Sequence, residues 1–282
     1  EIKECDWSSD VCSSDLLPSK RPTSLKATSP TTVKEAFLSM ISNPTLCALQ
    51  FAYEGHSFEE NFATLSSLVS QTPDHGIVLA PELCLSGYSY DRMHEAAAFS
   101  RNMLPKLAKL SHLKTLGLTL IERKENCFFN TFHLFCDGHL VYTQAKAKLF
   151  ALGDEMRYFH AGKLEDIRIV QIEGIKIAVL ICFELRFPAL WERIKGADVI
   201  LVPAYWGKQR KDHFETLGSA LAIADQSYVI CANSSDDSMA ASSGIITPFG
   251  EAYRDDQKSV LTHAFDRHEI QTMRRYINIG LA

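Results

Sequence analysis

The chain has 282 residues, of which 46% are hydrophobic and 22% charged, a composition typical of a globular protein. The formal net charge of −5 is spread over both signs without a basic block, which argues against nucleic acid or an anionic membrane surface as a partner. No apolar run approaches the roughly 20 residues of a membrane-spanning helix, and the first residues lack the apolar core of a signal peptide. We therefore expect a soluble, cytoplasmic protein whose partner is a small molecule.

The first 44 residues differ in character from the rest. The segment ECDWSSDVCSSDL at 4–16 resembles the translation of a sequencing adaptor, and we interpret it as an artefact. The residues that follow are rich in Ser, Thr and Pro and offer little to bury, which is typical of disorder. The predicted organisation is a disordered leader over 1–44 and one folded domain over 45–282.

From residue 45 the pattern alternates strands and helices. The first strand is predicted over 46–52, and a serine and a glutamate three residues apart, Ser57 and Glu60, form a capping box that begins a helix. The apolar run at 76–80 is typical of a strand covered on both faces. The later elements are predicted as a helix over 93–112, strands over 115–122, 127–136, 139–147, 167–172 and 175–181, a helix over 188–195, a strand over 197–203, a helix over 208–226, a strand over 228–233, three short strands between 243 and 265, and a helix over 267–276.

Two dipeptides mark tight turns between neighbouring strands. Asp137-Gly138 and Glu173-Gly174 favour hairpins, because residues that tolerate positive φ match the twist of the flanking strands. Neither an internal repeat nor an interdomain linker is visible, so the pattern predicts one α/β domain with mixed sheets.

The eight cysteines do not form a recognisable framework. They include no CxxC pair and make no compact ligand set with the ten histidines. Most are therefore interpreted as small buried hydrophobic residues, and we expect no metal.

Three segments place a reactive side chain where an apolar strand ends. These side chains are Glu82, Lys146 and Cys182. Ligands of open α/β sheets bind at the carboxyl ends of strands. A thiolate, a carboxylate and an ammonium suffice to attack a carbonyl or nitrile carbon, to move the proton and to stabilise the oxyanion. Taken singly, each residue has a structural explanation, since a cysteine that closes an apolar run is more often part of a core.

The three segments together resemble the carbon-nitrogen hydrolase, or nitrilase, superfamily. The residues that carry the resemblance are PEL at 81–83, KAKLF at 146–150 and CFELRFP at 182–188, in that order. The resemblance runs from about residue 45 to the last predicted helix. It implies a four-layer α-β-β-α sandwich with two mixed β-sheets, a homodimer or higher homo-oligomer, and hydrolysis of a small amide or N-carbamoyl compound through a Cys thioester without any cofactor.

Carried over to this sequence, the resemblance implies roles for particular residues. Glu82 matches the general base, Lys146 the oxyanion lysine and Cys182 the nucleophile, while Glu155 matches a second glutamate near the lysine. The backbone N–H of Phe183 would complete the oxyanion site. This helix start should also favour the Cys182 thiolate.

Other residues are expected at the rim of the site. Tyr205 and Trp206 could form a pocket wall, with packing under the loop as the equal alternative for Trp206. Two positions depart from the family pattern: Lys148 stands where many members have histidine, and Glu184 where many have aspartate. We expect Glu184 to pair with Arg186 as a brace. Lys148 and Arg210 hint at an anionic group in the substrate.

Three alternatives remain open from the sequence. Cys182 could use His213 as its base, as in papain-like enzymes, although His213 lies in a helical pattern. The substrate could be a small nitrile. The chain could also be a catalytically silent scaffold of the same fold, although such a scaffold has no chemical need for a Glu, a Lys and a Cys together.

Overall fold

The computed structural model describes residues 43–281. The predicted leader lies outside these residues except for Asn43 and Pro44, which belong to no helix or strand. Within the described range, no helix is long and apolar enough to cross a membrane.

The first sheet contains six strands in the order β12-β1-β2-β3-β4-β5. Its strands are β1 (Thr45–Leu49), β2 (Ile77–Leu79), β3 (Thr115–Lys124), β4 (Cys127–Cys136), β5 (His139–Ala145) and β12 (Val260–Ala264). The neighbours β1, β2 and β3 run parallel, whereas β12, β4 and β5 join by antiparallel pairing.

The second sheet repeats this plan with six strands in the order β11-β10-β9-β8-β7-β6. Its strands are β6 (Val170–Ile172), β7 (Ile175–Val179), β8 (Val199–Ala204), β9 (Tyr228–Asn233), β10 (Gly244–Ile246) and β11 (Ala252–Arg254). Here β7, β8 and β9 run parallel and the remaining pairs are antiparallel.

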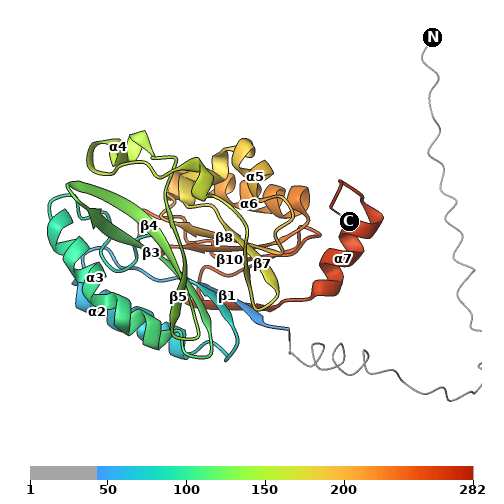
Figure 1. Ribbon diagram of the computed structural model, residues 1–282, viewed down its shortest axis with the longest axis horizontal. Coiled ribbons are helices and arrows are strands. Elements are labelled where there is room, and N and C mark those ends of the chain that lie inside the picture. The colour runs from blue at the N-terminus through green and yellow to red at the C-terminus, as the bar shows by residue number, and fades with distance from the viewer. Residues whose placement is uncertain (1–42, 282) are drawn as a thin grey trace, which may run out of the picture. The chain divides into compact units, whose positions relative to one another are not determined.

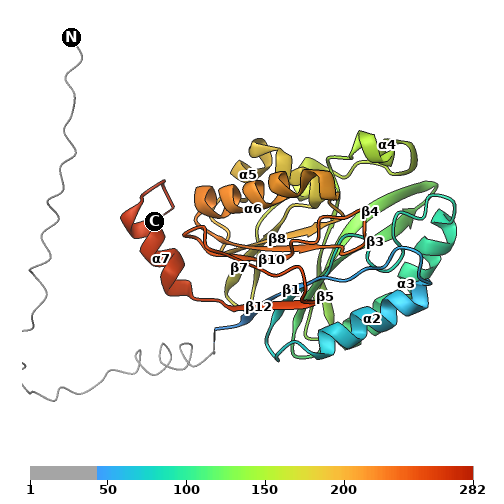
Figure 2. The ribbon, with the colours of Figure 1, turned by 180° about the vertical axis from the view of Figure 1, so that it is seen from behind.

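Helices cover the outer face of each sheet, while the inner faces pack against each other. The helices are α2 (Phe58–Ser70), α3 (Met93–Leu110), α4 (Glu155–Tyr158), α5 (Pro188–Ile194), α6 (Lys211–Asp225) and α7 (Arg267–Tyr276). Figure 1 shows α2 and α3 below the first sheet and α5 and α6 above the second, and the reverse view in Figure 2 shows the same four layers. The predicted α-β-β-α sandwich with two mixed sheets is confirmed.

The main apolar core lies between the sheets. Its buried side chains include Leu79 and Phe132 from the first sheet and Val179 and Leu201 from the second. A further apolar cluster fills the space between the first sheet and helices α2 and α3. This double burial explains the continuous apolar runs of the central strands.

The local signals in the sequence account for several element boundaries. The capping box is present, because the Glu60 N–H donates to Ser57 Oγ at 3.2 Å and the Ser57 N–H donates to Glu60 Oε2 at 2.8 Å. Both predicted hairpin turns have positive φ, at 42° and 82° for Asp137 and Gly138 and at 48° and 78° for Glu173 and Gly174. The short helix α4 and the 3₁₀ turn at Cys182–Arg186 were not predicted.

Candidate active site

The predicted reactive residues follow strands that end at the same edge of the sandwich. Glu82 comes just after β2, Lys146 just after β5, and Cys182 just after β7. The first sheet therefore supplies the carboxylate and the ammonium, and the second supplies the thiol. The Glu82 N–H donates to Ala204 O at 3.1 Å, which ties the two strand ends together across the sheets.

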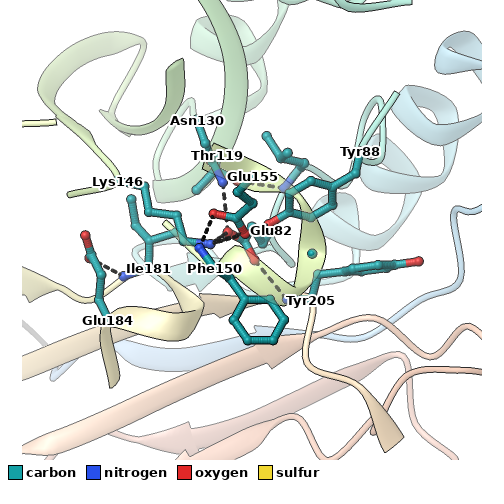
Figure 3. Close-up of polar contacts among 12 residues, drawn as sticks. Glu82, Tyr88, Thr119, Asn130, Lys146, Phe150, Glu155, Ile181, Glu184 and Tyr205 are labelled. Atoms are coloured by element: carbon teal, nitrogen blue, oxygen red, sulfur yellow. Dashed lines mark hydrogen bonds and ion pairs between the residues drawn. The ribbon is translucent and has the colours of Figure 1, made fainter. Parts of the chain in front are cut away.

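Lys146 lies between two carboxylates (Figure 3). Its Nζ donates to Glu82 Oε1 at 2.7 Å and to Glu155 Oε1 at 2.7 Å, and its side chain is fully buried. These two carboxylates hold the pKa of Lys146 above its ordinary value despite burial, which acts in the opposite direction. The third N–H of the ammonium makes a longer contact, to the Tyr88 hydroxyl at 3.5 Å.

Two side chains that sequence reasoning missed complete the polar cluster. The Asn130 Nδ2 donates to Glu82 Oε1 at 2.8 Å, and the Tyr88 hydroxyl donates to Glu155 Oε1 at 2.9 Å. Tyr88 belongs to the GY pair six residues after Glu82, whereas Asn130 sits inside a strand pattern that gave no signal. Burial, followed by the charge of Glu155, raises the pKa of the Tyr88 phenol, which keeps it a donor.

Cys182 begins its 3₁₀ turn in a left-handed backbone conformation. Its φ is 47°, which is uncommon for a residue with a side chain and is a form of strain found at functional sites. The Tyr205 N–H donates to Glu82 Oε2 at 3.1 Å, and Tyr205 and Cys182 line the same two cavities. The loop after β8 thus brings the Glu82 carboxylate to the wall that Cys182 shares.

The expectation that a helix start favours the Cys182 thiolate is wrong for the free site. Burial raises the pKa of this thiol well above its ordinary value, and the charge of Glu82 raises it further, while Lys146 lowers it. The turn that follows spans five residues, Cys182–Arg186, and is not a full α-helix with a strong dipole. Cys182 in the free site is thus a neutral thiol.

The predicted pairing of Glu184 with Arg186 is also wrong. Glu184 is fully buried and accepts hydrogen bonds from the Ile181 N–H at 2.7 Å and from the Ala147 N–H at 2.6 Å. Figure 3 shows its carboxylate turned toward Ile181 and away from the Glu82 cluster. Backbone donors next to Cys182 and Lys146 thus take the place of the arginine, and Glu184 still braces the turn.

A cavity of about 300 Å³ opens onto this cluster, and a smaller one of about 20 Å³ adjoins it. Cys182 and Tyr205 line both cavities, while Phe183 and Trp206 line the smaller one. The side chain of Trp206 is buried, and its indole N–H donates to Arg210 O at 2.8 Å. Trp206 is therefore both pocket wall and packing residue, and the two interpretations of the sequence are compatible.

Two arginines stand at the cavity beside Cys182. Arg186 lines the smaller cavity and Arg210 lines both. In the part of the chain that the structure describes, neither guanidinium forms an ion pair with an Asp or Glu side chain. Burial lowers the pKa of Arg186, and the positive charge of Arg210 lowers it further. These two charges face the cavity without an anion from the protein.

Lys148, the other predicted cation, lies elsewhere. Its ammonium stands over the ring of Phe187 at 5.3 Å, and it lines neither cavity. His213, the alternative base, is exposed on α6, and its Nδ1 lies 3.1 Å from Arg186 Nη2. The charges with the largest effect on the pKa of the Cys182 thiol are those of Glu82, Lys146 and Glu155. Glu82 is therefore a better candidate for the base than the exposed His213.

Comparisons with known proteins find amidases among the relatives of this chain. A 2-oxoglutaramate amidase of Bacillus subtilis (strain 168) is 31% identical over 219 residues, which cover 73% of this chain and 83% of the relative. The omega-amidase YafV of Escherichia coli (strain K12) is 30% identical over 163 residues, covering 56% of this chain and 61% of the relative.

The fold is shared with solved structures. The structure of Saccharomyces cerevisiae Nit3, a member of branch 10 of the nitrilase superfamily, superposes with a TM-score of 0.75 at 19% identity and covers 85% of this chain and 96% of that one. The family model named carbon-nitrogen hydrolase matches residues 45–275. The chain thus belongs to the carbon-nitrogen hydrolase family and is a carbon-nitrogen hydrolase, as the resemblance of its three motifs predicted.

Proposed function

We propose that the protein hydrolyses the terminal amide of a small compound that also carries a carboxylate. The observation that supports this substrate is the pair Arg186 and Arg210, which face the Cys182 cavity without a carboxylate partner from the described chain. Guanidinium groups bind carboxylates through paired hydrogen bonds. The similarity to a 2-oxoglutaramate amidase points the same way, since that substrate is both an amide and a carboxylate.

In the proposed mechanism, Cys182 attacks the amide carbon while Glu82 takes the thiol proton. The raised pKa of the thiol makes this transfer part of the attack, because a free thiolate is scarce in the resting site. Glu82 then passes the proton to the leaving nitrogen, the carbon–nitrogen bond breaks, and ammonia departs from a thioester. Water activated by Glu82 attacks the thioester, which releases the acid and restores the thiol.

The oxyanion that forms in both steps needs fixed donors. The third N–H of Lys146 and the backbone N–H of Phe183 are the proposed donors. The other two N–H groups of Lys146 bind Glu82 and Glu155 at 2.7 Å, whereas the third makes only the 3.5 Å contact with the Tyr88 hydroxyl, which an oxyanion can replace. Glu155 and Tyr88 hold the Lys146 ammonium in place. Because Lys146 also pairs with Glu155, Glu82 is not its only counter-ion. Neither step requires a metal or an organic cofactor.

An ammonia-release screen tests the proposal. The protein is offered succinamate, 2-oxoglutaramate, the neutral amide butyramide, N-carbamoyl amines and small nitriles, with Cys182→Ala as the blank. We expect ammonia from the carboxylate-bearing amides at a higher kcat/KM than from butyramide. Ammonia from nitriles alone, or equal kcat/KM for succinamate and butyramide, would contradict the proposed substrate. No turnover together with iodoacetamide labelling at the rate of a model thiol would support the scaffold alternative.

We also propose a homodimer in the cytoplasm. The dimer is supported by the family resemblance, and the location by the cysteines of the described part of the chain, which are unpaired. Light scattering coupled to gel filtration tests the dimer, and a monomer at micromolar concentration would contradict it.

A further inference from the structure

Two residues that lie far from Arg186 in the sequence, Trp206 and His213, contact its guanidinium. Its guanidinium carbon stands 4.7 Å from the centre of the Trp206 ring, a cation–π distance. Its Nη2 lies 3.1 Å from Nδ1 of His213, on the first turn of α6. One face of the guanidinium is thus covered, and one of its N–H groups has a defined acceptor.

We propose that His213 is a positioning residue that orients Arg186 to bind the substrate carboxylate. This inference rests on the proposed carboxylate-bearing substrate. It adds the residue that holds Arg186 in the orientation that binds the substrate carboxylate. His213 touches neither the thiol nor the reacting carbon in this role. It sets the affinity for the anionic group of the substrate, whereas Glu82 and Lys146 act on the amide.

The proposed role requires one state of the imidazole. A guanidinium has only donors, so Nδ1 of His213 has to accept the hydrogen bond through its lone pair. The role therefore requires the neutral imidazole with its proton on Nε2. An imidazole that accepts from Arg186 uses the lone pair that a base for Cys182 would need on the same atom, which separates this role from the papain-like one.

Packing of the first turn of α6 fixes the backbone position of His213. The next residue, Phe214, is fully buried, and its ring packs on Trp206 with 5.2 Å between ring centres. Trp206 is itself anchored, because its backbone N–H donates to Asn233 Oδ1 at 2.7 Å and its indole N–H donates to Arg210 O at 2.8 Å. His213, Trp206 and Arg186 therefore form one rigid unit beside the cavity.

The need for such a holder follows from the charges. Arg186 and Arg210 both line the small cavity, and the positive charge of Arg210 disfavours the charged form of Arg186. Without an acceptor, the guanidinium of Arg186 would be better solvated in water than at the cavity, since the described chain offers it no carboxylate. The imidazole offers an uncharged acceptor, which holds the arginine and leaves its positive charge for the substrate.

Steady-state kinetics on succinamate and butyramide test the inference with the variants His213→Ala and His213→Asn. The asparagine side-chain oxygen stands near the place of Nδ1, so it can accept the same hydrogen bond. For His213→Ala we expect KM for succinamate to rise about tenfold, the order of one hydrogen bond to a charged group. We expect kcat to stay within about twofold, and kinetics on butyramide to stay unchanged, because the amide chemistry lies elsewhere. His213→Asn should recover most of the KM.

Each other outcome overturns the inference in a recognisable way. If His213→Ala abolishes turnover of both amides while its melting temperature is unchanged, His213 is the base and not a positioning residue. If Arg186→Leu loses the preference for succinamate but His213→Ala keeps it, the proposed substrate stands and the role of His213 is wrong. If the unsubstituted protein shows no preference for succinamate, the proposed substrate fails, and the inference fails with it. A variant of His213 that does not fold leaves the asparagine variant to decide.

Discussion

Lys146 determines the charge balance of the buried cluster. It places one ammonium between the carboxyl groups of Glu82 and Glu155, and burial raises the pKa of Glu155. A thiolate at Cys182 would add a negative charge to this buried site, where burial and the charge of Glu82 already raise the pKa of the thiol. This charge balance supports the proposed attack with simultaneous proton transfer.

Replacing Glu82 by glutamine distinguishes the proposed role of Glu82 as base from the proposed role of Cys182 as nucleophile. We expect kcat for amide hydrolysis to fall by about 10² to 10⁴, the range for losing a general base. Iodoacetamide labelling of Cys182 should be undiminished or faster, because removing the negative charge of Glu82 lowers the pKa of the thiol. Ammonia release and the labelling rate at pH 8 measure the two effects.

The matched control is Glu165→Gln, which removes a carboxylate from the exposed 3₁₀ turn at Leu164–Asp166. Both rates should match those of the unsubstituted protein. If Glu82→Gln lowered labelling and turnover by the same factor, Glu82 would serve the fold of the site and not proton transfer.

At the scale of elements, Glu184 joins the two segments that present the amine and the thiol. Its carboxylate receives the N–H of Ala147, which follows Lys146, and the N–H of Ile181, which precedes Cys182. Because these segments continue β5 and β7, one side chain couples the end of a strand in each sheet. Ionisation of Glu184 costs stability in the folded protein, since burial raises its pKa to about 7.

This raised pKa predicts a pH dependence that can be isolated with Glu184→Gln. The folded protein holds a proton on Glu184 up to about pH 7, whereas the unfolded chain loses it near the ordinary value of 4.5. The stabilising contribution of Glu184 is therefore greatest below pH 4.5 and is lost as the pH rises through 7. Glutamine does not ionise, so the unfolding free energy of the variant relative to the unsubstituted protein should rise by about 3 kcal/mol between pH 4.5 and 8.

Urea unfolding at several pH values measures this difference, with Glu165→Gln on the exposed 3₁₀ turn at Leu164–Asp166 as the control. The control difference should stay flat across the same range. A flat difference for Glu184→Gln as well would mean that Glu184 is ionised throughout and that its two backbone donors outweigh its burial.

The elements that sequence predicts well are those specified by local signals. The capping box at Ser57, the two hairpin turns and the strand ends that carry Glu82, Lys146 and Cys182 depend on residues a few positions apart. The failures concern partners that only the packed sheets bring together. Glu184 pairs with the backbone N–H of Ala147, which lies 37 positions earlier, and Asn130 reaches Glu82 from 48 positions later. No spacing rule encodes such contacts.

At the scale of the whole molecule, the site exists only while the two sheets are packed together. Glu82 and Lys146 come from the first sheet, and Cys182 comes from the second. The Tyr205 N–H, at the end of β8, donates to Glu82 across the gap. A shift of about 1 Å between the sheets would misplace the thiol, and misplacement of this size can cost about a hundredfold in rate. Activity should therefore report on sheet packing.

Phe132→Ala tests this dependence, because Phe132 is a fully buried ring on β4 in the core between the sheets. We expect the unfolding free energy to fall by about 3 to 5 kcal/mol through lost burial and the cavity left behind. In a urea titration, ammonia release and tryptophan fluorescence should change at the same, lowered midpoint. The control is Val141→Ala on β5, whose side chain is 43% exposed and whose loss should change stability by less than about 0.5 kcal/mol. Activity that persists after the fluorescence transition would show that the site survives without the packed sheets. Activity that disappears well before it would show that the site opens locally while both sheets stay folded.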